Sequence, residues 1–235
     1  MAIHPDQVLV TGGSGPAIAL FVQLLTNPGD VLLTEDYTYV GTLAIMRNLR
    51  ARIVGIKTDE QGMIPESLEE TIKDLARFEV TPRMIYTIPT FQNPSGRTLT
   101  LERRRRLVDL VVAHGIDVLE DDPYRLVRYD GEPVPSLHEL EGGTRVTFTS
   151  SFSKTAAAPG LRVGWFVVPE ALRAAVEDRA SSTYISPAFL PQAIIHELFV
   201  RGAFETNLAR VNGLLRAQKD AMLAALEREM PEGVG

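Results

Sequence analysis

The segment SSFSKTAAAPGLRVGW carries a lysine, Lys154, among small residues and directly after a run rich in β-branched residues. In a dry and crowded pocket a lysine side chain is shifted toward its neutral amine, the form that attacks a carbonyl carbon to make a Schiff base. Arg162 follows eight residues later, and a guanidinium group can bind a phosphate through two parallel hydrogen bonds. A lone lysine is more often an ordinary surface residue, so it is the pairing with Arg162 that indicates chemistry.

Asp121 ends the segment DVLED at 117–121, which is expected to be a strand. An acidic side chain at a buried strand end is unfavourable unless it meets a cation, and a protonated pyridine nitrogen of a ligand would supply one. Tyr124 and Asn93, which lies in FQNPSG, are hydrogen-bond donors that could reach an oxygen of the same ligand. A capping Asp, a packing Tyr and a turn Asn before Pro94 are the structural alternatives.

The glycine-rich turn GGSG precedes a predicted helix. The bare amides of Ser14 and Gly15 would stand at the positive end of the helix dipole, which is a binding site for anions such as phosphate. The turn matches neither the Rossmann nor the Walker pattern, and such turns serve packing just as often. The anion site is therefore a hypothesis that depends on its neighbours.

Strands and helices must alternate to position these residues. Short β-branched runs predict strands, and amphipathic segments between them predict helices, which together indicate a three-layer αβα domain with a mainly parallel central sheet. The expected strands are 8–11, 31–35, 52–56, 83–89, 117–121, 145–150 and 162–168, and the expected helices between them are 16–25, 38–49, 65–78 and 100–114. After Pro169 only helices are expected, at 169–180, 190–200 and 204–230.

Five polar or glycine-rich clusters follow five of the expected strands. They are Gly12 to Gly15, Glu35 to Tyr39, Asn93, Asp121 to Tyr124, and Ser151 to Lys154. In an open parallel sheet, ligands bind at the carboxyl ends of the strands, so we expect these clusters to meet at one edge.

Bulk composition excludes several classes of protein. The chain of 235 residues has no cysteine, so it has no disulfide, no thiolate metal site and no cysteine nucleophile. Its histidines (His4, His114, His138 and His196) show no metal-binding spacing, so no metal site is expected. A net charge of −6 argues against a nucleic-acid-binding surface covering the domain.

No apolar run approaches the roughly 20 residues that span a bilayer, and the first residues lack the pattern of a signal peptide. We therefore expect a soluble, cytoplasmic protein without a membrane partner. The run Arg103 to Arg106 lies in the first turns of the helix expected at 100–114. It is interpreted as a solvated helix face in preference to a binding patch.

Five ordered segments together resemble the fold-type I pyridoxal-phosphate (PLP) dependent aminotransferases of class I/II. The resemblance is strongest to the branch with 2-aminoadipate and aromatic aminotransferases and the effector domains of MocR-like regulators. The segments are VTGGSGPAIAL, EDYTYVG, YTIPTFQNPSG, VLEDDPYRLVRYDG and SSFSKTAAAPGLRVGW, from Val10 to Trp165. The resemblance implies PLP as cofactor and transfer of an amino group from an L-amino acid to a 2-oxo acid.

The resemblance also implies roles for individual residues. Lys154 would hold the cofactor as a Schiff base and transfer the proton, with Asp121 and Tyr124 as the other catalytic residues. Asp121 would keep the ring nitrogen protonated, so that the ring accepts electrons. Binding of the cofactor would fall to a wider set: Ser14, Gly15, Tyr39, Asn93, Asp121, Tyr124, Ser151, Lys154 and Arg162. The bond between Asn93 and Pro94 is often cis in the family, although trans is the default from sequence alone.

Members of the family also have an N-terminal segment and a C-terminal small domain, which are not recognised in this sequence. The expected division is a PLP-binding large domain at 1–204 and a long helix at 205–235 that leads toward a small domain. The resemblance further implies a homodimer. Two departures stand out, since Gly15 and Tyr37 replace the glutamine and the proline that relatives commonly have.

Two other functions fit parts of the sequence. The domain could be the PLP-binding effector domain of a MocR-like transcription regulator. Ser151 to Lys154 also satisfies the S-x-x-K pattern of serine hydrolases of the penicillin-binding class, but the companion motifs of that class are absent from the sequence.

Overall fold

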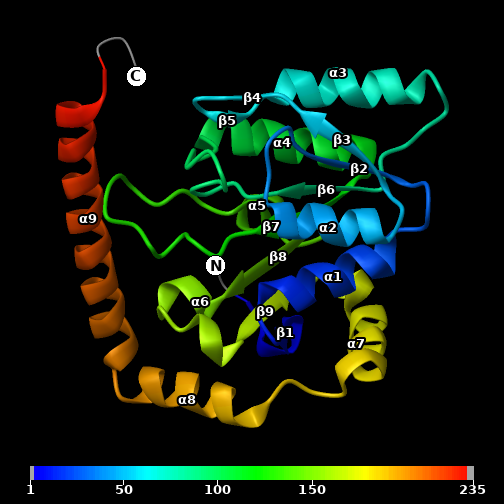
Figure 1. Cartoon of the computed structure of the whole chain (residues 1–235). Helices are drawn as coiled ribbons and strands as arrows, with labels where there is room; N and C mark the ends of the chain where they lie inside the picture. The colour runs from blue at the N-terminus through cyan, green and yellow to red at the C-terminus, as the bar shows by residue number, and fades with distance from the viewer. Residues whose placement is uncertain (1–2, 232–235) are drawn as a thin grey trace.

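The computed structural model describes residues 3–231, and its centre is a seven-stranded sheet with the order β1-β9-β8-β7-β6-β2-β3 (Figure 1). The strands are β1 (Val8–Thr11), β2 (Val31–Glu35), β3 (Arg52–Ile56), β6 (Met84–Thr87), β7 (Asp117–Asp121), β8 (Val146–Ser151) and β9 (Gly164–Val167). The five strands from β8 to β3 run parallel, whereas β9 is antiparallel to both of its neighbours. The predicted mainly parallel sheet is confirmed.

The antiparallel strand β9 follows from a connection that never crosses the sheet. Between β8 and β9 the chain forms only α6 (Phe152–Thr155) and the 3-10 turn η2 (Pro159–Leu161). Ser151 at the end of β8 therefore pairs with Gly164 at the start of β9. Without a crossover helix the two strands must run in opposite directions. The consequence for function is that residues 152–163 stay at the carboxyl end of β8.

Helices cover both faces of the sheet, which confirms the three-layer αβα architecture (Figure 1). One face carries α3 (Pro65–Ala76), α4 (Leu101–His114) and α5 (Leu137–Glu141), and the other carries α1 (Ser14–Leu25), α2 (Val40–Asn48) and α7 (Glu170–Tyr184). Leu107 and Leu137 are fully buried in the first layer, as are Phe21 and Val176 in the second. Because both faces are covered, the central strands β2, β6, β7 and β8 are buried along almost their whole length.

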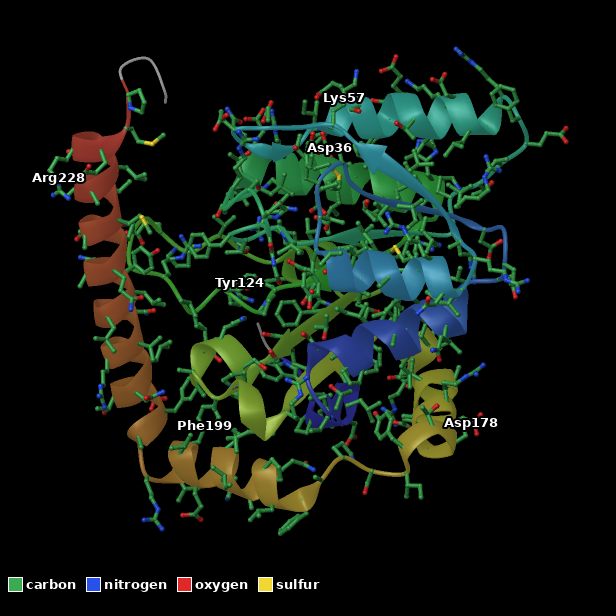
Figure 2. The ribbon with its side chains drawn as sticks, viewed as in Figure 1. Asp36, Lys57, Tyr124, Asp178, Phe199 and Arg228 are labelled. Atoms are coloured by element: carbon green, nitrogen blue, oxygen red, sulfur yellow. The ribbon has the colours of Figure 1, made fainter. Side chains whose placement is uncertain are left out.

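The last two helices, α8 (Phe189–Val200) and α9 (Ala203–Glu229), lie beside the layered body (Figure 1). Phe152 of α6 contacts Phe199 and Phe204, with ring centroids 5.8 and 6.0 Å apart. Figure 2 shows Phe199 on the side of α8 that faces α6. These aromatic contacts attach the pair of helices next to the segment that carries Lys154. None of the helices within residues 3–231 combines the length and the apolar character needed to cross a bilayer.

The run of arginines on α4 corrects the sequence interpretation. Arg105 and Arg106 are exposed as expected, but Arg104 has an exposed fraction of 0%. Arg103 is also partly buried, where it forms an ion pair with Asp59 next to the small hairpin of β4 (Thr58–Asp59) and β5 (Gly62–Met63). The interpretation of the whole run as a solvated face is therefore wrong, because the side chain of Arg104 points into the protein.

Candidate active site

All nine residues predicted for the site line one cavity of about 290 Å³ at the carboxyl ends of the strands. These are Ser14, Gly15, Tyr39, Asn93, Asp121, Tyr124, Ser151, Lys154 and Arg162, and the wall is completed by Ile88, Pro123, Ser153 and Pro159. They come from five different strand ends and from the β8 to β9 connection. The expected convergence of polar clusters at one edge of the sheet is present in the structure.

One end of the cavity is suited to an anion. Gly13, with a φ of 105°, is the N-cap of α1, and because glycine has no side chain the first amides of α1 receive no side-chain cap. A Cβ atom at this position would lie 2.3 Å from Nη2 of Arg162, which shows that the guanidinium group rests directly against the glycine. Ser151 and Ser153 line the same cavity. Amides, a guanidinium group and hydroxyls together are the donors that bind phosphate.

Arg162 reaches this place from an unexpected backbone position. The sequence places it at the start of the strand 162–168, whereas β9 begins at Gly164 and Arg162 precedes it in a left-handed conformation with φ of 55°. That conformation directs the side chain back across the β1 to α1 turn. Such a φ is uncommon for a residue other than glycine and often occurs at functional sites.

Asp121 lies at the closed side of the cavity with an exposed fraction of 4%. Tyr86 donates a hydrogen bond from Oη to Oδ2 of Asp121 at 2.8 Å, while Oδ1 has no hydrogen-bond partner among the described residues. Burial raises the pKa of Asp121 to about 7, and the nearby acidic groups Asp122 and Glu35 add to the shift. A buried carboxylate with an unpaired oxygen is a partner for a cationic donor of a ligand.

Tyr124 and Asn93 meet although they belong to different loops. Burial raises the pKa of the Tyr124 phenol, and a hydrogen bond with the side chain of Asn93 opposes that shift. Figure 2 labels Tyr124 in the central part of the molecule, near α6. The peptide bond between Asn93 and Pro94 is cis, so the default expectation of a trans bond is wrong here.

Lys154 occupies the third position of α6 and is exposed within the cavity wall. We expected the side chain of Lys154 to lie in a dry and crowded pocket. Among the residues that the structure describes, none covers it closely enough, and the side chain is exposed. The reason is local, since α6 has only four residues and stands at the rim of the cavity. Tyr39, the N-cap of α2, is likewise 43% exposed at the opposite rim.

Two buried side chains that the sequence argument did not assign hold the cavity wall. Glu35 accepts hydrogen bonds from Thr87 Oγ1 and from the backbone N–H of Ile88, which fixes the end of β6. Gln92 donates from Nε2 to the carbonyl of Tyr37 at 2.6 Å and thereby joins the loop of Asn93 to the loop of Tyr39. The signal for Gln92 is its position directly beside Asn93, and the signal for Glu35 is its place at the start of the predicted cluster Glu35 to Tyr39.

A comparison with protein families supplies the classification. The sequence model described as aminotransferase class I and II matches residues 1–228. The chain belongs to the aminotransferase class I and II family.

Named aminotransferases, two of them of known structure, are similar to this chain in sequence or in structure. Aromatic-amino-acid aminotransferase 1 of Thermococcus litoralis is 33% identical over 99% of the chain and 55% of its own length. A kynurenine aminotransferase structure from Pyrococcus horikoshii, in complex with PMP, gives a TM-score of 0.94 at 34% identity over 99% of the chain and 58% of its own. An alpha-aminoadipate aminotransferase structure from Thermus thermophilus, complexed with N-(5'-phosphopyridoxyl)-L-leucine, gives 0.88 at 36% identity over 98% and 58%.

The chain therefore spans somewhat more than half the length of the relatives that it matches. All three of these proteins carry the name of an aminotransferase. The similarity favours the enzyme interpretation over the transcription regulator and the serine hydrolase.

Proposed function

We propose that this chain forms the PLP-binding part of an aminotransferase that transfers the amino group of an L-amino acid to a 2-oxo acid. The observation that carries the proposal is the cavity itself. It combines a lysine, an anion-binding cradle and a buried carboxylate with an unpaired oxygen in one space of about 290 Å³. Family membership and the two relatives with bound phosphopyridoxyl compounds or PMP support it.

The residues present fit PLP at three separate points. The free amides of α1, with Arg162 packed against Gly13, suit the phosphate. The unpaired oxygen of Asp121 suits a protonated ring nitrogen. Lys154 lines the same cavity and suits the aldehyde carbon. A phosphate, a ring cation and an aldehyde are the features that distinguish PLP from other small cofactors.

When bound, PLP supplies an aldehyde that condenses with amines and a ring that accepts electrons from the substrate α-carbon. In the proposed mechanism Lys154 Nζ holds the cofactor and then moves a proton at the substrate α-carbon. Asp121 would stabilise positive charge on the ring nitrogen. Asn93 and Tyr124 would hold the ring oxygen, and Tyr39 would stack on the ring.

Phosphate binding would orient the cofactor rather than take part in the proton transfer. Ser14, Gly15, Ser151 and Arg162 would fix the phosphate, with Ser153 as an additional donor that the structure suggests. Anchoring the phosphate would keep the reactive carbon of the cofactor within reach of Lys154. Such orientation can contribute several kcal/mol to lowering a barrier.

Borohydride reduction tests the role of Lys154 directly. The full-length protein is mixed with PLP, reduced and digested, and the peptide with Lys154 should carry the mass of the reduced cofactor. Lys154→Ala should carry none, whereas Lys57→Ala, at an exposed lysine away from the cavity, should be labelled as the wild type is (Figure 2). Labelling of Lys154→Ala to the wild-type extent would refute the assignment.

Amino-group transfer is tested next with a panel of donors and 2-oxoglutarate as acceptor. The names of the relatives suggest aromatic amino acids, 2-aminoadipate and kynurenine as the first donors. We expect the 2-oxo acid of the donor and glutamate to accumulate in equal amounts. Failure with every donor, in a protein that is labelled at Lys154, would limit the function to cofactor binding.

For the protein as a whole we propose a cytoplasmic homodimer in which residues 1–204 form the PLP-binding domain. Residues 205–235 would lead toward a second, smaller domain. The length of the relatives supports this division, because the chain covers 55 to 58% of them. Size-exclusion chromatography with light scattering measures the oligomeric state of the full-length protein.

A further inference from the structure

Arg104 is a charged residue in the interior, on the first turn of α4. Removing a guanidinium group from water is costly unless each of its donors finds a partner. Arg104 meets this condition, because it makes four hydrogen bonds and an ion pair with the equally buried Glu120, with Nη1 and Oε1 3.8 Å apart. A group so fully bonded fixes the geometry of whatever it contacts.

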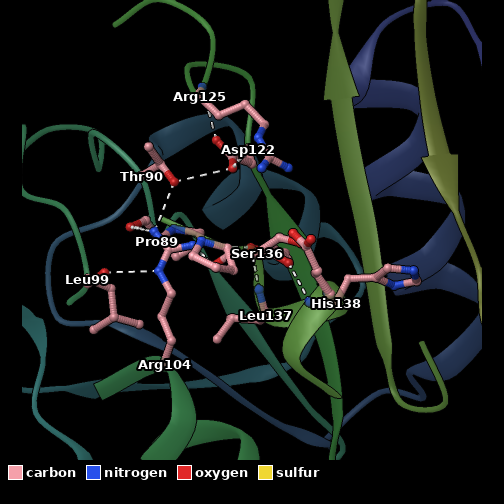
Figure 3. Close-up of polar contacts among 12 residues, drawn as sticks. Pro89, Thr90, Leu99, Arg104, Asp122, Arg125, Ser136, Leu137 and His138 are labelled. Carbon is pink, nitrogen blue, oxygen red and sulfur yellow. Dashed lines mark hydrogen bonds and ion pairs between the residues drawn. The ribbon is translucent and has the colours of Figure 1, made fainter. Parts of the chain in front are cut away.

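Its contacts fasten both ends of one loop. Nε donates to the carbonyl of Leu99 at 2.9 Å, and Nη2 donates to the carbonyl of Pro89 at 2.7 Å (Figure 3). The segment between Pro89 and Leu99 carries Asn93, one of the residues that line the cavity. The backbone N–H of Leu99 also donates to the carbonyl of Pro89 at 2.8 Å, so the planar fork of Arg104 braces the two joined ends of the loop of Asn93 from the side of α4.

Thr90 connects this loop to β7. Arg104 Nη2 donates to Thr90 Oγ1 at 3.0 Å, and Thr90 Oγ1 donates onward to Asp122 Oδ2 at 3.2 Å (Figure 3). Asp122 follows Asp121 directly, and its Oδ1 accepts from the backbone N–H of Arg125, which closes the turn that contains Tyr124. One chain of hydrogen bonds thus joins the loop of Asn93 to the segment from Asp121 to Tyr124.

We propose that Arg104 and Thr90 are positioning residues that set the place of Asn93 against Tyr124 and Asp121. The proposal rests on the proposed function, since it assigns these three residues to the cofactor site. Asn93 and Tyr124 lie on separate loops, so the hydrogen bond between them depends on how the two loops are held together. Site residues keep productive geometry only when the residues behind them are themselves fixed.

The test uses variants of Thr90, because changes there leave the buried charges of Arg104 and Glu120 in place. Thr90→Val keeps the shape and removes the bridging hydroxyl, and Thr90→Ser keeps the hydroxyl. Arg104→Lys is the second disruption, since one ammonium nitrogen cannot replace a fork that reaches both Leu99 and Pro89. Arg103→Lys is its matched control on the same turn, where the side chain binds Asp59 and neither residue lines the cavity.

Full-length protein loaded with PLP is measured for kcat and KM, for the pKa of the bound chromophore, and for the denaturation midpoint. In Thr90→Val and Arg104→Lys we expect kcat to fall by about tenfold to a hundredfold, because roughly 1 Å of misplacement can cost that much. KM should change little. The chromophore pKa should rise, because hydrogen bonds donated to a phenolate oxygen stabilise its ionised form. Thr90→Ser and Arg103→Lys should behave as the wild type.

A purely structural role gives a different pattern. If kcat per folded molecule and the chromophore pKa stay at wild-type values in Thr90→Val and Arg104→Lys, the proposal is overturned, whatever happens to the denaturation midpoint. Wild-type kinetics in Thr90→Val alone removes Thr90 from the proposal. A wild-type protein without transamination or labelling at Lys154 would instead contradict the proposed function, so the two failures are distinguishable.

Discussion

Asp121 shows how a single side chain can be placed at a cost to the fold. Its carboxyl group is buried, it accepts one hydrogen bond from Tyr86, and its second oxygen has no hydrogen-bond partner among the described residues. Burial consequently raises the pKa of Asp121 to about 7 from the ordinary value of 3.8. A cationic ligand would offset the free energy that is lost by burying the carboxylate. The arrangement therefore favours binding of such a ligand at the expense of the stability of the ligand-free chain.

The effect on stability has a definite sign. Between pH 3.8 and about 7 the unfolded chain has lost the proton of Asp121 while the folded chain keeps it. The free energy of unfolding therefore falls as the pH rises through that window. In Asp121→Asn this penalty is absent and Tyr86 still has an oxygen to donate to. We expect the cofactor-free variant to be more stable than the wild type above pH 7, with a difference that grows across the window.

The same variant should bind PLP but transfer amino groups at least about 10²-fold more slowly, the order of loss when one electrostatic partner of a reacting charge is removed. Denaturant unfolding at several pH values and half-reaction rates measure the two effects. A stability difference that does not depend on pH would contradict the assigned titration. Wild-type rates would contradict the role of Asp121 toward the ring nitrogen.

At the level of the elements, the long periodic segments were predictable and the short ones were not. Strands such as 31–35 and 52–56 match the structure residue for residue, because short runs rich in β-branched and other apolar residues between helical segments leave a clear local signal. The short elements have only two to five residues each, which is too few for any periodicity. They are the strands β4 and β5 and the helices α5 and α6. Their positions follow from the neighbouring layers.

The candidate site likewise has residues that were predictable from the sequence and residues that were not. Residues at strand ends were found because parallel strands bring their carboxyl ends to one edge. The burial of Arg104 was not predictable from its own helix, since its partners are carbonyls of Pro89, Leu99 and Pro135 that only the tertiary structure brings to it. The exposure of Lys154 was missed for a related reason, because the sequence gives no measure of how closely other segments cover a strand end.

Gly164, at the start of β9, allows a close approach of the backbone to the turn between β1 and α1. A Cβ atom there would lie 2.5 Å from the carbonyl carbon of Gly13 and 2.7 Å from the amide nitrogen of Ser14. Gly164→Ala must therefore push the start of α1 away from β9 and displace the amides proposed to bind phosphate. We expect about tenfold weaker binding of PLP, since overpacking costs roughly 1–3 kcal/mol and 1.4 kcal/mol is a factor of ten.

Gly160→Ala is the matched control, because a Cβ atom at Gly160 meets nothing within 4 Å. Titration of each cofactor-free protein with PLP, followed by fluorescence or absorbance, gives the two dissociation constants. Equal constants for the two variants would show that the β1 to α1 turn can move without loss of the phosphate site.

At the scale of the whole molecule, α9 is the element least embedded in the fold. Phe204 is its one buried residue among those described, and the helix runs along the side of the layered body (Figure 1). Two side-chain hydrogen bonds tie it to the site segments. Asn207 Nδ2 donates to the carbonyl of Ala156, and Asn212 Nδ2 donates to the carbonyl of Leu126, each at 3.1 Å. The acceptors stand two residues beyond Lys154 and two beyond Tyr124.

These contacts couple α9 to the cavity. If PLP orders the segments of Lys154 and Tyr124, it must also strengthen the hydrogen bonds that those segments accept from α9, because coupling between two sites is reciprocal. We expect PLP to slow hydrogen exchange of α9 amides in the wild type. In the double variant Asn207→Ala, Asn212→Ala the exchange of α9 should be faster and insensitive to PLP, while the sheet stays protected.

Gln218→Ala, at an exposed position of the same helix, should retain the response to PLP. Slowing of α9 by PLP in the double variant, to the same degree as in the wild type, would show that the coupling runs through other contacts of α9, such as the aromatic contacts of Phe204 with Phe152 or the ion pair of Lys219 with Asp130.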